Sequence, residues 1–117
     1  MINIKPVILV FFNCFLLVTG QILWKIGLDK VRFNGLRDVL NLISNKYISL
    51  GMFVYVISTF YWFYILKRFS LSKVYPLQSF SYVLAPIFGY FILEESITKN
   101  SIIGTIFICI GVFFIAK

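Results

Sequence analysis

The chain has 117 residues, 61% of them hydrophobic, and eleven Lys and Arg residues against four Asp and Glu residues give it a net charge of +7. In a soluble protein such a charge would suggest nucleic-acid binding. Here the basic residues flank long apolar stretches, where they meet anionic lipid headgroups. We therefore expect membrane lipids, and no nucleic acid, as partners.

Four apolar stretches dominate the chain, at about residues 6–26, 47–66, 74–93 and 101–116. A helix needs about 20 mostly apolar residues to cross about 30 Å of hydrocarbon. Helices also satisfy their own backbone hydrogen bonds in that environment. The sequence thus predicts an all-α membrane protein, with one domain of four transmembrane helices over residues 1–117.

The first stretch places Asn13, Leu17, Gln21 and Lys25 four residues apart, and so on one helix face. Polar side chains in hydrocarbon usually face a bundle interior or a cavity. Asn13, Gln21 and Lys25 are therefore candidate substrate-binding residues, although a lysine near a helix end also simply extends its ammonium group to the interface. Gly20 beside this face permits close approach by another backbone.

The connection to the second stretch has an amphipathic pattern, with Leu36, Val39, Leu40 and Ile43 at i, i+3, i+4 and i+7. This spacing indicates a short helix that lies on the membrane surface. The same residues also fit an early turn of the second span, because helix boundaries are uncertain by several residues.

The second and third stretches each carry a polar and aromatic face. Tyr55 and Trp62 lie on the face of the second stretch that also carries Ser58 and Thr59. The third stretch is predicted to open at Tyr75-Pro76. It has Tyr75, Gln78, Ser79 and Tyr82 at i, i+3, i+4 and i+7, which places them on one helix face. The three faces can line a pocket near mid-membrane, or each polar group can bond across helices to pack them. If the three faces line a pocket, the substrate-binding residues are Asn13, Gln21, Lys25, Tyr55, Trp62, Tyr75, Gln78, Ser79 and Tyr82.

The fourth stretch has small residues on one face, Gly104 and Gly111, seven positions apart. Small residues let apolar helices approach closely in a membrane. We interpret these glycines as an oligomer contact, which predicts a dimer. Thr98 or Asn100 is expected to cap the N-terminus of the helix formed by this fourth stretch.

Residues that support catalysis or metal binding are few. Histidine is absent, and Cys14 and Cys109 both lie inside apolar stretches without metal-ligand spacing. The spans hold no nucleophile–base pair and no paired acids. We expect no metal, no cofactor and no enzymatic activity.

Several short motifs together resemble one family. Gly20-Gln21 followed by Lys25, Tyr75-Pro76 followed by Ser79, and the glycine-containing fourth stretch are similar to four-helix members of the drug/metabolite transporter superfamily. The acidic turn from Leu93 to Thr98 is similar to that of EamA-type repeats. The resemblance implies a bundle like that of the small multidrug resistance proteins, assembled as a dimer.

Two branches of that superfamily differ in what they imply. The small multidrug resistance proteins exchange cations for protons with a glutamate three residues before the matching glycine, where this chain has Leu17. Subunits of the aminoarabinose-phosphoundecaprenol flippase share the Gly-Gln, Lys and Tyr-Pro elements. The second resemblance implies movement of a lipid-linked sugar across a membrane.

The expected function is therefore a transporter that flips a polyprenyl-phosphate-linked sugar, or a related lipid-linked anion, across the bacterial inner membrane. It would work as a homodimer, or as a heterodimer with a similar small subunit. A small-cation exporter and a membrane subunit that transports nothing are the alternatives. In the flippase reading Lys25 binds the phosphate, because a cation at the end of a polar helix face suits an anionic group.

Overall fold

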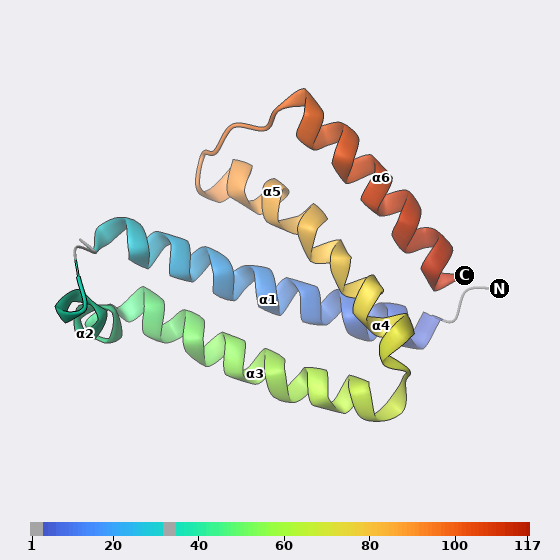
Figure 1. The fold of residues 1–117 in the computed structure, drawn as a ribbon, viewed down its shortest axis with the longest axis horizontal. Coiled ribbons are helices and arrows are strands. Elements are labelled where there is room, and N and C mark those ends of the chain that lie inside the picture. The colour runs from blue at the N-terminus through green and yellow to red at the C-terminus, as the bar shows by residue number, and fades with distance from the viewer. Residues whose placement is uncertain (1–3, 32–34) are drawn as a thin grey trace.

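The computed structural model describes residues 4–31 and 35–117, and every regular element in these two ranges is a helix. A surface α-helix, α2, follows the long α1, and the remaining elements come in close succession (Figure 1). In chain order the elements are α1 (Ile4–Lys30), α2 (Arg37–Ser44), α3 (Lys46–Arg68), α4 (Leu71–Leu77), the 3-10 helix η1 (Gln78–Phe80), α5 (Ser81–Ile92) and α6 (Lys99–Ala116).

Three of these helices, α1, α3 and α6, are long and apolar enough to cross a membrane. The third predicted span is instead divided into α4, η1 and α5. Its predicted opening at Tyr75-Pro76 was wrong, because the helix begins at Leu71 and Pro76 lies inside α4. The earlier start puts Val74 and Leu77 on one buried face. A proline inside a helix removes one hydrogen-bond donor, and the chain tightens into η1 directly afterwards.

The tightest packing in the fold joins α1 to α3, which run side by side (Figure 1). A Cβ atom added to Gly51 would lie 2.6 Å from Cδ1 of Trp24 and 2.9 Å from the carbonyl oxygen of Gly20. Only glycine permits such an approach. The predicted close contact at Gly20 is confirmed, with Gly51 as its counterpart.

The connection between these two helices contains a separate short helix, α2, and not an early turn of the second span. Leu36 beside it and Leu40 and Ile43 within it are largely exposed. Asn45 ends α2 and caps α3, since its Oδ1 accepts hydrogen bonds from the backbone N–H groups of Tyr47 and Ile48. Its Nδ2 donates to the carbonyl of Gly27, 3.4 Å away, and so ties the end of α1 to the start of α3.

The buried core lies where α1, α4 and the C-terminal end of α6 meet (Figure 1). Elsewhere α6 is mostly exposed, and its apolar residues face outward. Thr98 caps α6 by accepting a hydrogen bond from the N–H of Ser101 at 3.1 Å, as one of the two predicted capping residues. The core consists of Val10, Cys14, Val18, Ile65, Val74, Leu77, Leu84, Val112 and Ala116.

Candidate functional site

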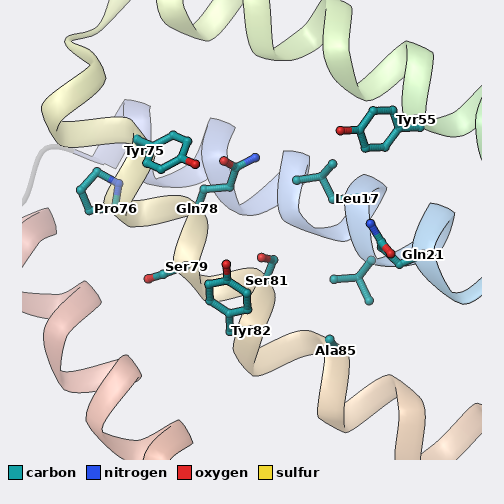
Figure 2. Close-up of a pocket in the computed structure, with 11 residues that line it drawn as sticks. Leu17, Gln21, Tyr55, Tyr75, Pro76, Gln78, Ser79, Ser81, Tyr82 and Ala85 are labelled. Carbon is teal, nitrogen blue, oxygen red and sulfur yellow. The ribbon is translucent and has the colours of Figure 1, made fainter.

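A cleft of about 630 Å³ lies between α1, α3 and the broken helix α4–η1–α5. Its lining combines amides, hydroxyl groups and phenols with a few apolar side chains (Figure 2). The lining residues are Leu17, Val18, Gln21, Tyr55, Tyr75, Pro76, Gln78, Ser79, Ser81, Tyr82 and Ala85.

The break in the third span shapes one wall of this cleft. Two contacts hold η1 against α1: the rings of Phe80 and Phe11 stack with centroids 4.1 Å apart, and the thiol of Cys14 donates to the carbonyl of Gln78 at 3.5 Å. With η1 fixed in this way, the spacing of Tyr75, Gln78 and Tyr82 places all three on the cleft wall.

The opposite wall comes from α1 and α3. The hydroxyl group of Tyr55 points across the cleft toward Tyr75, and Gln21 lies beside it on α1 (Figure 2). The Tyr55 ring packs on Trp24 with centroids 5.2 Å apart. Trp24 in turn occupies the space that Gly51 leaves open, so the close helix contact also positions the tyrosine.

Several polar side chains of the cleft have no hydrogen-bond partner among the described residues. Across the described residues 4–31 and 35–117, the side chains of Gln21, Gln78, Tyr55 and Tyr75 make no hydrogen bond. Tyr75 and Tyr82 are 63% and 68% exposed, so the cleft opens to the surroundings of the protein. It therefore offers uncommitted donors and acceptors to a ligand from outside.

Six of the nine residues predicted from the sequence line the cleft: Gln21, Tyr55, Tyr75, Gln78, Ser79 and Tyr82. The other three lie elsewhere. Asn13 is fully buried and accepts a hydrogen bond of 2.8 Å from Ser58, and Trp62 packs against the core. The ammonium group of Lys25 lies 3.4 Å from a carboxylate oxygen of Asp29.

Sequence reasoning missed Ser81 and Ala85 in the lining. Both follow Gln78 at helical spacing, i+3 and i+7, so the same periodicity that singled out Tyr82 could have found them. Leu17 also lines the cleft, one turn before Gln21. Leu17 is also the position at which the small multidrug resistance proteins have their glutamate. In this chain that position lines the cleft with an apolar side chain.

The two glycines predicted as an oligomer contact lie on α6. No atom comes within 4 Å of a Cβ added to Gly104 or Gly111. A side chain at either position would therefore meet no other helix among the described residues.

Comparison with known proteins identifies relatives over nearly the whole length. The family model of the EamA-like transporter family matches residues 3–117. A probable 4-amino-4-deoxy-L-arabinose-phosphoundecaprenol flippase subunit ArnF of Serratia proteamaculans (strain 568) is 38% identical over 111 residues, which cover 86% of this chain and 84% of that protein. The ArnF of Proteus mirabilis (strain HI4320) is 32% identical over 117 residues, covering 90% and 86%.

A longer protein is also similar. The uncharacterized transporter YoaV of Bacillus subtilis (strain 168) is 39% identical over 75 residues, which cover 64% of this chain and 24% of YoaV. No solved structure matches the chain.

Proposed function

The chain belongs to the EamA-like transporter family, and from that premise we propose that it is a subunit of a flippase for a polyprenyl-phosphate-linked sugar in the bacterial inner membrane. Three helices able to span a membrane, together with membrane-transporter relatives, make it a multi-pass membrane protein. The relatives named as flippase subunits support the substrate class, and they are transporter subunits, not enzymes.

The observation that carries this proposal is the open cleft, whose amides and hydroxyl groups have no hydrogen-bond partner among the described residues. Its volume of about 630 Å³ lies within the range of about 300–1,000 Å³ that small-molecule sites occupy. A sugar headgroup has such dimensions and hydroxyl groups to bond with the lining, while its polyprenyl tail stays in lipid. The exposed Tyr75 and Tyr82 lie where the headgroup would enter.

The proposed topology has four crossings, with α4, η1 and α5 together forming the third. Transporters often place substrate sites at interrupted transmembrane helices, and the break at η1 lies on the cleft wall. An even number of crossings returns the chain to its starting side. In agreement, the start of α1 and the end of α6 lie at the same end of the molecule (Figure 1).

The proposed assembly is a dimer, either of this chain or with a similar small subunit. Four helices are too few to surround a sizeable headgroup on every side. An added Cβ at Gly104 or Gly111 on α6 has no neighbour within 4 Å among the described residues, which leaves room for a partner helix at these two positions. Small residues at such a face favour close helix association in a membrane.

A transport measurement tests the proposal. The protein is purified from membranes in mild detergent, with any subunit that co-purifies, and reconstituted into liposomes. Uptake of a radiolabelled, water-soluble citronellyl-phosphoryl sugar should exceed that of empty liposomes, and Gln78→Leu should lower it. Binding without uptake would indicate a non-transporting subunit, and the absence of both would overturn the proposal.

A further inference from the structure

We propose that the cleft selects an uncharged, hydroxyl-rich sugar ring and discriminates against a ring that carries an ammonium group. This inference rests on the proposed function, because it specifies the headgroup of the lipid-linked sugar. It differs from the aminosugar that the names of the flippase relatives contain.

Among residues 4–31 and 35–117, no charged side chain lines the cleft. No Asp, Glu, Lys or Arg occurs among the residues that form its walls, and Leu17 contributes an apolar side chain from α1. An ammonium group that leaves water for a partly enclosed site needs an opposite charge or strong acceptors. The lining supplies amide and hydroxyl oxygens but no carboxylate.

None of the four acids of the chain lines this cleft. Asp29 pairs with Lys25, and Asp38 on α2 accepts a hydrogen bond from Asn41. Glu94 lies in the exposed turn after α5. Glu95 lines a separate cleft of about 340 Å³ between α5 and α6, which shares only Ala85 with the larger one.

The polar groups that do line the cleft match sugar hydroxyl groups. The amides of Gln21 and Gln78 both donate and accept, as each sugar hydroxyl does. The phenols of Tyr55, Tyr75 and Tyr82 add hydroxyl groups at the edge of apolar rings, which can cover the C–H face of a sugar. Because the glutamine amides have no partner among the described residues, a neutral ring completes their hydrogen bonding without a charge to compensate.

Three probes with the same lipid test the proposal: farnesyl phosphate, farnesyl-phosphoryl glucose and farnesyl-phosphoryl glucosamine. The full-length protein in lipid nanodiscs is titrated with each at pH 7, and Kd is measured by native mass spectrometry. We expect the glucose probe to bind about tenfold more tightly than either other probe, the gain of one or two well-formed hydrogen bonds. Gln78→Leu should remove this advantage, and Thr105→Val on α6 should keep it.

A charge variant keeps the test decisive if Gln78→Leu misfolds. Gln78→Glu places a carboxylate in the cleft and should reverse the preference toward the glucosamine probe. Glu95→Gln, in the separate smaller cleft, should leave the preference for the glucose probe unchanged. If the unaltered protein prefers the glucosamine probe, or binds all three equally, the neutral-ring inference is overturned while lipid-linked sugar transport stands. If none of the three binds, both proposals fail.

Discussion

The hydroxyl group of Ser58 on α3 donates a hydrogen bond of 2.8 Å to Oδ1 of Asn13 on α1, and both side chains are almost fully buried. Asn13 was predicted to contact substrate, and in the structure it joins two helices. The Nδ2 atom of Asn13 has no partner among the described residues. The bond from Ser58 to Oδ1 is therefore the one hydrogen bond that the Asn13 side chain makes with them.

Ser58→Ala should therefore destabilise the contact between α1 and α3. It leaves the whole Asn13 amide buried without a partner, at a cost of about 0.5–2 kcal/mol. The free energy of unfolding in a mixed-micelle denaturation series measures the effect. Thr59→Val is the matched control, because the Thr59 hydroxyl donates to the backbone carbonyl of Tyr55 in its own helix. Equal effects of the two variants would contradict the packing role of Ser58.

Gly51→Ala should both destabilise the fold and weaken ligand binding. The new methyl group would lie 2.6 Å from Trp24 and 2.9 Å from the Gly20 carbonyl, so the helices must separate or the indole must move. Tyr55 packs on that indole and lines the cleft, so its position should shift as well.

Two measurements separate these effects: thermal unfolding, and binding of a farnesyl-phosphoryl sugar. We expect the free energy of unfolding to fall by about 1–3 kcal/mol, which is typical when an extra group is forced into a packed contact. Gly104→Ala serves as the control, since nothing lies within 4 Å of its added methyl group. A Gly51→Ala protein as stable as the Gly104→Ala protein would argue against the close helix contact.

If the proposed dimer forms through this face of α6, Gly111→Leu should shift the protein toward monomer in detergent, because the leucine would separate the two helices. Native mass spectrometry reports the oligomeric state. Cys109→Leu introduces the same side chain on the opposite side of α6 and should leave the oligomer intact. An oligomer that survives Gly111→Leu but not Cys109→Leu places the interface on the other face.

Lys25→Ala should weaken binding of a polyprenyl phosphate only modestly. The Lys25 side chain is 53% exposed and pairs with Asp29, and exposed charges contribute about 1 kcal/mol or less, or about fivefold in Kd. Asp29→Asn releases the ammonium group and should tighten binding, with both effects shrinking at high salt. Lys117→Ala at the far end is the control. Identical Kd values for Lys25→Ala and Lys117→Ala would remove Lys25 from the phosphate site.

Leu17→Glu should create a cation site in the cleft. The carboxylate would lie one turn before Gln21, in a lining that has no other charged side chain among the described residues. Binding of tetraphenylphosphonium should appear in this variant and be absent from Leu17→Gln, which has the same size without the charge. The unaltered protein should show no proton-driven uptake of quaternary ammonium ions in liposomes, and robust uptake would favour the cation-exporter alternative instead.

The periodicity of the third stretch was enough to predict one wall of the cleft. Tyr75, Gln78 and Tyr82 recur at helical spacing, and local spacing survives the change from α4 to η1 because a 3-10 turn rotates the chain only slightly more per residue than an α-turn. The start of that helix at Leu71 was not predicted, because Pro76 was interpreted as a first-turn residue. In the structure the helix begins five residues before Pro76, and Val74 and Leu77 are both buried in the core.

The helical class, the apolar stretches and the residues that share a helix face could be predicted without a structure, because they depend on local composition and on a fixed helical period. What each residue on a face contacts depends instead on how the helices pack against one another. Asn13, Gln21 and Lys25 share one face of α1, yet they contact Ser58, the open cleft and Asp29. Their surroundings differ because α3 and the broken third span lie along different parts of α1, and long-range packing sets that arrangement.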